Sequence, residues 1–501
     1  MPGDVNFRKE DKMGSKLLSK SKYLNGLQCP KLLWISFNRP ELIPQPDAVT
    51  QNRFDQGNLV GELAKSLFPE GIDIPTDDFI KNIHMTKELI KLRKPLFEAA
   101  VMVGQRYSRA DILSPAGEDE WDLIEVKSST EVKDVNLHDV SFQKLCWEDS
   151  GVKIRKCFLA YINNKYIKNG EVNPHELFIL EDISERVEEV GKDIWDRIDE
   201  MFEIVIMADC PETPIGPQCS DPYACALSSF CRANLPEHNV FTLYCGGKKA
   251  CELYNLGITE IAEIPLIFQL NEKQQIQRSC IVNNETYLDK ERIQLFLKEL
   301  QYPLYLLDFE TFSTVIPLFD GTHPYQNIPF QFSLHIKEAP ESVLQHISFL
   351  SEGTGDPRPG LIDTLSKSIG ESGSIVAYNK SFEENVLKDL SIAFPQHTDW
   401  INAILSRFID LLAPFRGFAY YNPSQKGSAS LKKVLPAVTG MDYTGLEIAK
   451  GDDASLAYLD MAYGDLSEAE RLTIREQLLS YCGLDTEGMV RIIEKLEEMT
   501  G

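Results

Sequence analysis

The chain has 501 residues, 43% of them hydrophobic, which is enough to form more than one core, so two or three domains are expected. The formal net charge of −25 argues against a protein that coats DNA non-specifically, because binding to phosphates needs Lys and Arg. No apolar stretch is long enough to span a bilayer, and the Lys-rich start has no apolar signal-peptide core, so the sequence predicts a soluble, cytoplasmic protein without a membrane partner.

Residues 1–22 are polar and are predicted to form an N-terminal tail. Residues 23–235 have the pattern of one α/β unit, which begins with helical stretches near 22–38 and 53–69. Apolar runs predict strands at 99–103, 110–113, 122–126 and 156–162, with a helix at 139–148 between the last two. A stretch rich in Cys, Pro and Gly ends the unit and excludes a long helix there.

Asp111 and Glu125 lie on two of these predicted strands, and Lys127 lies two residues beyond Glu125. Because side chains alternate along a strand, Glu125 and Lys127 are expected on one face. Two carboxylates on adjacent strands can share Mg²⁺ or Mn²⁺, and an ammonium beside them can stabilise the charge that builds on a phosphate. Surface acids with a solvated lysine are the alternative for so short a pattern.

Three more side chains extend this predicted metal site. Glu98, in the first apolar run, is a candidate third carboxylate. Gln143 and Trp147 are four residues apart on the predicted helix, so they share a face and are candidates to contact DNA or the lysine.

With Asp111, then Glu125 and Lys127, then a helix that carries Gln143, residues 23–235 resemble the PD-(D/E)XK nucleases of the RecB type, which include CRISPR-associated exonucleases. The resemblance implies a restriction-endonuclease-like fold, with Asp111 and Glu125 as metal ligands and Lys127 as the catalytic lysine. RecB-type nucleases usually carry a metal-binding His on an early helix. The stretch 56–64 has no His, and Glu62 is the candidate in its place.

Eleven cysteines in a chain predicted to be cytoplasmic indicate metal or cluster ligation where they gather, rather than disulfides. Cys219, Cys225 and Cys231 recur at equal spacing, and Cys29 lies far upstream. RecB-type nucleases with iron–sulfur clusters have one Cys before the core and three after it, so the resemblance implies a [4Fe–4S] cluster on these four residues. A Zn²⁺ site with Cys210 in place of Cys29 is an alternative, and buried cysteines without a metal are another. The other cysteines are interpreted as core or incidental positions: Cys146, Cys157, Cys245, Cys251, Cys280 and Cys482.

Residues 236–300 are charged and mainly helical in pattern, and we predict a helical connector there. Within it, residues 250–265 have the pattern of a helix, a turn centred on Gly257 and a second helix. Such a hairpin can present backbone N–H groups to a phosphate backbone. Short helical hairpins are also common as plain connectors, and that is the interpretation we favour.

Residues 301–501 have the pattern of a second α/β unit. Apolar runs predict strands at 304–308, 329–336, 375–378 and 408–411, and a long terminal helix at 467–499. Asp308 and Glu310 alternate with Phe309 at the end of the first of these strands, so both are expected on one side of the sheet.

Two predicted helices add to this second set of acids. Glu383 stands at a helix start after the third strand, and Tyr481 and Asp485 share one face of the terminal helix. Four carboxylates gathered in this way can hold two metal ions, which stabilise the attacking and leaving oxygens of an in-line displacement. Tyr481 is a candidate to orient the attacking water.

In this order of motifs, residues 301–501 resemble the DEDD exonucleases of DnaQ-like, ribonuclease H-like fold, and the Tyr-x-x-x-Asp ending resembles their DEDDy subgroup. The resemblance implies Mg²⁺ or Mn²⁺ held by Asp308, Glu310, Glu383 and Asp485. The family has Asp at the second motif, where this chain has Glu383.

Two polar residues near these motifs receive other roles. Asn379 is expected to shape the loop beside the site. Asp410, on a later predicted strand, is interpreted as structural, and it is the replacement ligand if Glu383 does not serve.

The joined arrangement resembles an uncharacterised bacterial family that couples a RecB-type nuclease to a DnaQ-like domain. We therefore expect a metal-dependent nuclease with two active centres that acts on single-stranded or end-exposed DNA, with a role in DNA repair or in processing foreign DNA by analogy of fold. One alternative is a nucleic-acid-binding or assembly module in which one or both centres are inactive. Another is an exonuclease that trims RNA.

Overall fold

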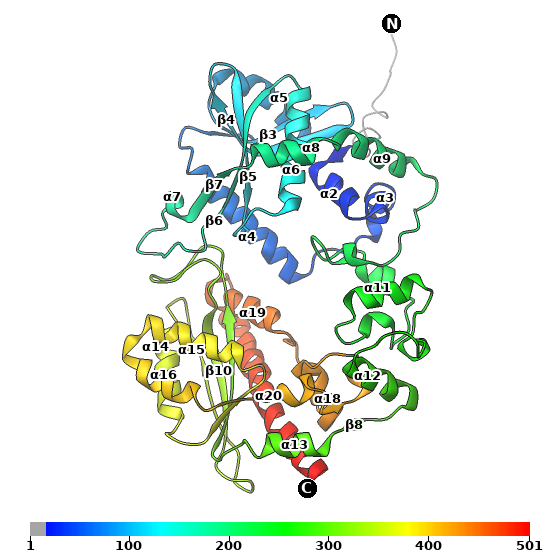
Figure 1. Cartoon of the computed structure of the whole chain (residues 1–501). Coiled ribbons are helices and arrows are strands. Elements are labelled where there is room, and N and C mark those ends of the chain that lie inside the picture. The colour runs from blue at the N-terminus through cyan, green and yellow to red at the C-terminus, as the bar shows by residue number, and fades with distance from the viewer. Residues whose placement is uncertain (1–16) are drawn as a thin grey trace. The chain divides into compact units, whose positions relative to one another are not determined.

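The computed structural model describes residues 17–501, which form two compact units (Figure 1). The first unit contains the residues up to 234 together with 314–325, and the second contains 235–313 and 326–501. Most of the predicted tail 1–22 lies outside the described residues, but its end is structured, because Leu18–Ser19 forms strand β1 and helix α2 begins at Lys20. Among residues 17–501, no helix is both long and apolar enough to cross a membrane.

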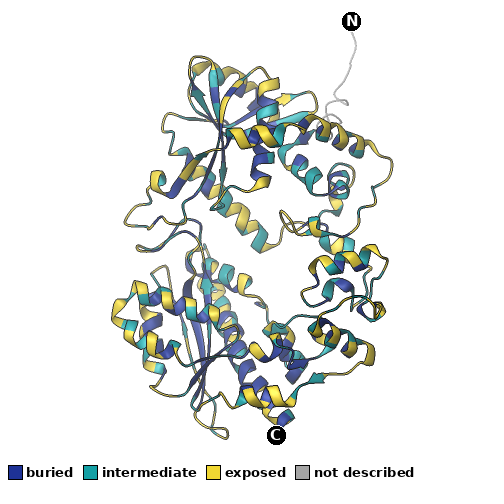
Figure 2. Cartoon of the chain, in the orientation of Figure 1, coloured by how far each residue is buried: buried dark blue, intermediate teal, exposed yellow. Residues whose placement is uncertain are grey.

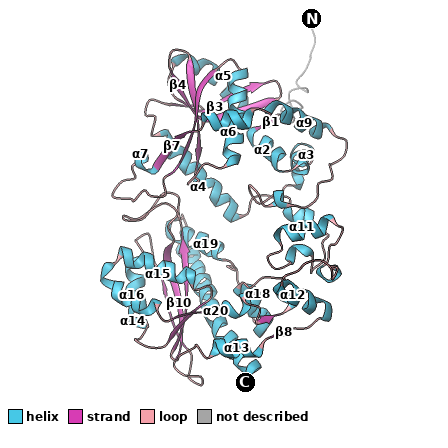
Figure 3. Cartoon of the chain, viewed as in Figure 1, coloured by secondary structure: helices cyan, strands magenta, loops and turns pink. Residues whose placement is uncertain are grey.

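A 7-stranded mixed sheet forms the centre of the first unit (Figure 3). Its strands are β1, β2 (Ile72–Asp73), β3 (Leu96–Val103), β4 (Arg106–Ala116), β5 (Glu120–Lys127), β6 (Lys153–Ile162) and β7 (Phe178–Asp182). They lie in the order β2-β3-β4-β5-β6-β7, and β1 pairs with β4. Neighbours among β3, β4 and β5 are antiparallel, whereas β5 and β6 are parallel, with helix α6 (Asp134–Asp149) between them in the chain.

The remaining helices of this unit are α2 (Lys20–Gln28), α3 (Pro30–Asn38), α4 (Ala48–Lys65), α5 (Phe79–Leu89), α7 (Pro174–Leu177), α8 (Ser184–Gly191), α9 (Ile194–Ile206) and α10 (Ser228–Arg232).

Strand alternation in β5 decides which of its residues meet helix α6. Leu123 packs in a core cluster with Val140 and Trp147 of α6. Ile124 packs on the other face, in a cluster with Val60 of α4. Glu125 and Lys127 follow Leu123 at steps of two and therefore face α6.

The segment 314–325 belongs to the first unit although it is distant in sequence. Val315 is 1% exposed and packs with the apolar cluster that covers the α4 face of the sheet. Lys168 Nζ lies 2.9 Å from Asp320 Oδ1, and the Tyr325 hydroxyl donates a hydrogen bond to the Ser128 carbonyl. These contacts make the segment a structural part of the unit.

The second unit is built on a 5-stranded sheet in the order β11-β10-β9-β12-β13. Its strands are β9 (Leu304–Phe312), β10 (Ile328–Lys337), β11 (Gln345–Leu350), β12 (Ser374–Ala377) and β13 (Phe408–Asp410), and a separate pair is formed by β8 (Tyr287–Leu288) and β14 (Tyr420–Tyr421). The first three strands of the sheet are antiparallel, and β12 is parallel to both β9 and β13. All four predicted strands are present. The edge strand β11, whose residues are mostly exposed or half-buried, was not predicted.

Helices cover both faces of this sheet, and the buried residues follow the two sheets (dark blue in Figure 2). The helices of the second unit are α11 (Gly247–Asn255), α12 (Glu272–Asn283), α13 (Lys290–Leu297), α14 (Arg358–Ser368), α15 (Ser381–Ala393), α16 (Thr398–Leu405), α17 (Ala413–Arg416), α18 (Leu431–Thr439), α19 (Gly451–Tyr463) and α20 (Glu468–Thr500), of which α14, α15 and α20 pack directly on the sheet. Leu307 and Phe309 of β9 pack with the cluster on α14 and α15, whereas Leu304 and Leu306 pack with the cluster on α20. Asp308 and Glu310 continue the α20 side.

The predicted connector 236–300 lies in the second unit and is part of its structure. Ile293 and Phe296 of α13 join the core cluster on α20, and β8 pairs with β14. The predicted helical hairpin at 250–265 is only half formed: α11 is a helix, but the second half contains just the 3-10 turn Ile261–Glu263.

Candidate metal centres

The first acidic group consists of Asp111, Glu125 and Asp139, from β4, β5 and α6. Ile112 pairs with Ile124 across β4 and β5, so the strand register brings Asp111 beside Glu125. The Val126 amide donates to Asp111 Oδ2 over 2.8 Å, which fixes the carboxylate at the sheet. Glu125 is 1% exposed. The structure therefore brings these two predicted ligands together.

Two lysines neutralise this group. Lys127 Nζ lies 2.6 Å from Glu125 Oε1 and 2.8 Å from Asp139 Oδ2, and Lys20 Nζ lies 2.8 Å from the same Glu125 oxygen. Gln143 Nε2 donates to Glu125 Oε2 over 2.7 Å and to Asp139 Oδ1 over 3.0 Å. Asp139 was not predicted from the sequence. Its position four residues before Gln143, on the same face of the helix, could have indicated it. Lys20, which the sequence placed in a tail, was not predicted either.

The neighbouring carboxylates of this group differ in pKa. Burial and the adjacent Glu125 raise the pKa of Asp111 to about 7. Burial alone would also raise the pKa of Glu125, but Lys127 and Lys20, with the Gln143 hydrogen bond, hold it below its ordinary value. The pair therefore carries one firmly ionised carboxylate and one that is only partly ionised near pH 7.

A cavity of about 950 Å³ opens onto the first acidic group. Asp111, Glu125 and Lys127 line it, together with Glu62 and Glu98. Glu98 Oε2 is paired with Arg109 Nε at 2.8 Å, and Glu62 Oε1 with Lys65 Nζ at 2.6 Å. Neither forms a compact ligand group with Asp111 and Glu125 within the described part of the chain.

Two predicted contacts with DNA at this site are wrong. Trp147 is fully buried in the core cluster of the first unit, so its ring packs against the sheet instead of a ligand. Gln143 is also fully buried, and its amide binds Glu125 and Asp139, so it positions the carboxylates and does not reach nucleic acid.

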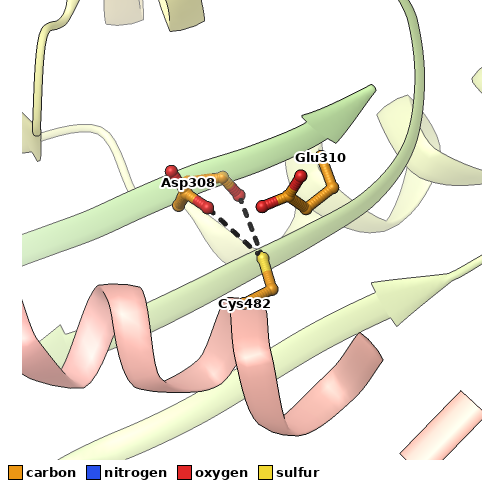
Figure 4. A group of neighbouring side chains, drawn as sticks. All are labelled: Asp308, Glu310 and Cys482. Carbon is orange, nitrogen blue, oxygen red and sulfur yellow. Dashed lines mark hydrogen bonds between the residues drawn. The ribbon is translucent and has the colours of Figure 1, made fainter. Parts of the chain in front are cut away.

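The second acidic group consists of Asp308, Glu310, Glu383 and Asp485, all residues predicted as ligands. Asp308 and Glu310 face α20, and Cys482 of α20 lies between them and the helix axis (Figure 4). Cys482 Sγ lies 3.5 Å from Asp308 Oδ2, and one ligand atom each of Asp308, Glu310 and Cys482 lie within 4.8 Å of one another. Cys482 is fully buried, which agrees with its interpretation as a core residue, but its thiol also lies beside the acidic group, which was not predicted.

Glu383 of α15 and Asp485 of α20 are near neighbours of Asp308 and Glu310, close enough for their charges to repel one another. Glu383 is 2% exposed, and within residues 17–501 its Oε2 atom has no hydrogen-bond partner. Asp485 is 6% exposed, and its Oδ1 atom accepts a hydrogen bond from the Tyr443 hydroxyl. Tyr481 is 3% exposed, and the ring of this predicted water-orienting residue lies 5.0 Å from Lys432 Nζ.

Burial and mutual repulsion oppose ionisation in the second acidic group. Desolvation raises the pKa values of Asp308, Glu310 and Glu383 well above the ordinary range, and the neighbouring carboxylates raise them further. Desolvation also raises the pKa of Asp485 to about 6, although the hydrogen bond from Tyr443 works against it. Lys432 offsets only part of this charge. Such a group gains most from a bound divalent cation.

The polar residues beside the second acidic group have structural roles. Asp410 Oδ1 accepts from the Asn379 amide at 2.9 Å and from the Leu412 amide at 3.1 Å, which agrees with the structural interpretation of Asp410. Asn379 has a φ of 71°, and its side chain accepts from Arg416 at 3.1 Å. It shapes the turn that leads from β12 into α15 and Glu383.

The structure also brings the predicted cysteine ligands together. Cys29 and Cys225 are buried in an apolar cluster whose partly buried members include Cys210, Cys219 and Cys231. Burial raises the pKa of the Cys225 thiol, and the neighbouring Cys29, Cys219 and Cys231 raise it further. Gln28 Nε2 donates to the carbonyls of Gln218 and Tyr223, at 2.9 and 2.7 Å, and so ties the α2–α3 junction to the Cys-rich stretch. All these cysteines are free thiols.

Comparisons with known proteins give relatives without an assigned activity. Residues 305–430 match a domain of unknown function (DUF2779), a stretch that contains Asp308, Glu310 and Glu383 but not Asp485. The uncharacterized protein MG366 homolog of Mycoplasma pneumoniae is 28% identical over 204 residues, which are 37% of this chain and 31% of that protein. The uncharacterized protein MG366 of Mycoplasma genitalium is 26% identical over 217 residues, which are 38% and 32% of the two chains. The chain thus matches less than a third of the length of these relatives.

Proposed function

We propose that the protein is a metal-dependent nuclease that hydrolyses phosphodiester bonds of DNA at single-stranded or exposed ends. The second acidic group carries this proposal: three buried carboxylates and the half-buried Asp308 come together from three elements, and their charge is only partly offset by the nearby Lys432. A group of this kind is costly to the fold unless it holds cations.

In the second unit, the topology and the residues both support a DEDD exonuclease of ribonuclease H-like fold. The sheet order β11-β10-β9-β12-β13, with only the first three strands antiparallel, is the arrangement expected of that fold. Mg²⁺ or Mn²⁺ held by the second acidic group would neutralise charge on the phosphate and act as a Lewis acid. Tyr481 and Tyr443 orient Asp485, and Lys432 at the rim can bind a substrate phosphate.

In the first unit, three antiparallel strands followed by the α6 crossover to parallel β6 support a PD-(D/E)XK, restriction-endonuclease-like fold. Asp111 and Glu125 would hold the cation. Lys127, whose ammonium donates a hydrogen bond to Asp139, would stabilise the charge on the phosphate. The cavity beside them is lined by basic side chains that would contact a nucleic-acid backbone: Lys20, Arg53, Lys65 and Arg109. Three of these are ion-paired with acids of the same cavity, so a phosphate would have to exchange with Glu125, Glu62 or Glu98 as the partner. Phe54 and Tyr223 also line it and are 54% and 53% exposed, so they offer stacking surfaces for unpaired bases and favour a single strand.

The cysteine cluster fits a [4Fe–4S] cluster better than Zn²⁺. Four thiolates around one Zn²⁺ lie about 3.8 Å apart, given a Zn–S distance of about 2.3 Å. Within the described residues, no three of these cysteine sulfurs lie within 4.8 Å of one another. A cluster on Cys29, Cys219, Cys225 and Cys231 spaces its ligands more widely and would act as a structural clip, with Cys210 beside it.

The test is cleavage of end-labelled single-stranded and duplex DNA, and of RNA, by full-length protein purified without oxygen and supplied with Mg²⁺ or Mn²⁺. Lys127→Ala and Asp308→Asn should each abolish the activity of one centre, and the double variant should lose cleavage by at least about a hundredfold. Asp465→Asn, an exposed acid of the second unit, serves as the matched control. Wild-type protein that cleaves neither DNA nor RNA would reject the proposal.

One observation favours a second function for the first unit alone. Lys20 and Lys127 already neutralise Glu125, so this centre can exist without a metal and can bind nucleic acid without cutting it. Retained cleavage in Lys127→Ala together with complete loss in Asp308→Asn would assign the first unit to binding.

A further inference from the structure

We propose that Cys482 makes the second acidic group a binding site for a thiophilic divalent cation of the Zn²⁺ class, with Asp308 and Glu310 as the oxygen ligands. The inference rests on the proposed cation site at this group and adds the identity of the preferred ion. A centre that used only hard ions such as Mg²⁺ would need oxygen ligands alone.

The three donor atoms lie about as far apart as the ligand atoms around a single metal ion. Cys482 Sγ lies 3.5 Å from Asp308 Oδ2, and one atom of Glu310 falls with them inside 4.8 Å. Around Zn²⁺, with Zn–S of about 2.3 Å and Zn–O of about 2.0–2.2 Å, neighbouring ligand atoms in a tetrahedron are about 3.5 Å apart. The three side chains therefore need little rearrangement to hold one ion.

A separate observation, on Glu383, supports a cation site at the same place. Glu383 is 2% exposed, and its Oε2 atom finds no partner within the described residues. Its carboxylate lies close enough to Asp308 and Glu310 for their charges to repel one another, so it neighbours the same group. A bound cation would satisfy this buried oxygen, which otherwise carries a desolvation cost.

The placement of Cys482 follows from the helix that carries it. Cys482 is fully buried on α20, three residues before Asp485, so both side chains are on the face of α20 that meets β9. Its Sγ also lies 3.9 Å from the Asp308 carbonyl. Binding of Zn²⁺ would form a bond to the sulfur and release the thiol proton to solvent. Soft thiolate ligands favour Zn²⁺ over Mg²⁺, so the thiol biases the site against the hard ion.

Metal titration of the full-length, metal-free protein tests this inference. Co²⁺ gives a thiolate-to-metal absorption band, and Zn²⁺ then displaces it. Because the cluster proposed for the cysteines of the first unit would also bind metal, the comparison is between wild type, Cys482→Ser and Cys280→Ser. Cys280 is buried in an apolar cluster with Phe418 and Tyr421, so it is a matched control.

Cys482→Ser should lose one bound equivalent of Zn²⁺, or bind it at least about tenfold more weakly, with a smaller Co²⁺–thiolate band. Asp308→Asn should weaken the same equivalent, and this second variant keeps the test open if Cys482→Ser unfolds. Cys280→Ser should match wild type. Unchanged Zn²⁺ stoichiometry and band in Cys482→Ser would overturn the inference even if Mg²⁺-dependent cleavage is found. Loss of the band in a protein that cleaves no nucleic acid would instead uphold the ion site and reject the nuclease.

Discussion

At the scale of single residues, the two acidic groups differ in how lysines balance their charge. Lys20 and Lys127 contact Glu125 directly and hold its pKa below the ordinary value. In the second group, desolvation and neighbouring carboxylates raise the pKa values of Asp308 and Glu310 instead. The charge of the first group is therefore balanced within the fold, whereas the charge of the second depends on what it binds.

The metal-free second unit should lose stability as the pH rises. Asp485 has a pKa of about 6 in the folded protein, above its ordinary value of 3.8. Its stabilising contribution is therefore complete below the unfolded pKa and is lost as the pH rises through the folded pKa, at about 1.4 kcal/mol for each pH unit between the two pKa values. Thermal unfolding between about pH 4 and 7.5 should show this fall, and Mn²⁺ or Asp485→Asn should reduce it. Equal slopes with and without metal would contradict the assignment.

Removal of the Lys20 ammonium should strengthen cation binding at the first acidic group. Lys20 Nζ lies 2.8 Å from Glu125 Oε1 and 3.7 Å from Asp111 Oδ1, so it competes with a cation for both carboxylates. Lys20→Met in an Asp308→Asn background should bind Mn²⁺ at least about tenfold more tightly, since a charge at this range acts with about 4 kcal/mol at an effective dielectric constant near 20. Electron paramagnetic resonance of free Mn²⁺ measures this, with the exposed Lys433→Met as control. Weaker binding would mean that Lys20 supports the metal.

At the scale of elements, β9 and α20 build the second centre between them. Alternation along β9 turns Asp308 and Glu310 towards α20, and the 33 residues of α20 supply Tyr481, Cys482 and Asp485 within little more than one turn. The distance between this helix and its neighbours therefore sets the geometry of the ligands.

Widening the contact between α20 and α18 should disturb the centre. A Cβ atom at Gly488 would lie 2.9 Å from Cδ2 of Leu435, a fully buried residue of α18. Gly488→Val should therefore destabilise the second unit by about 1–3 kcal/mol and weaken cation binding to the second acidic group. At Gly483 the nearest atom, His346 Cε1, is at 3.6 Å, so Gly483→Ala should stabilise α20 by about 0.5–1 kcal/mol. Urea unfolding compares the two, and equal effects would reject the packing argument.

The sequence indicated those parts of the fold and site that local patterns encode. Apolar runs predicted β9, and the spacing of Asp308 and Glu310 predicted their common face. Lys20 was missed because a lysine in a polar stretch carries no sign of a partner 105 positions away. Cys482 was missed because a single cysteine on a helix is usually core, and only the packing of α20 on β9 shows the acids beside it.

At the scale of the whole molecule, the chain passes from the first unit to the second at residue 234, returns for 314–325, and leaves again. A division at residue 235 would therefore remove Val315 from the apolar cluster of the first unit. Fragments cut at that point are incomplete, so tests of either acidic group require the full chain.

Truncation of Val315 should destabilise the first unit. Its side chain is 1% exposed, so Val315→Ala removes two buried methyl groups, at a cost of about 1.5 kcal/mol. Val343, which is 85% exposed, provides the control substitution Val343→Ala, expected within about 0.5 kcal/mol of wild type. Hydrogen exchange at β3 and β5 reports the loss. Unchanged exchange would show that the Val315 side chain does not stabilise the unit.

The return of 314–325 also has a consequence during synthesis. When residue 234 has left the ribosome, the first unit still lacks the strip of chain that covers its α4 side, and that strip is complete only at residue 325. At about 5–20 residues per second, the delay is roughly 5–20 s. During this interval the apolar surface that will receive Val315 is open to other nascent segments and to chaperones, and the second unit is being made before the first is finished.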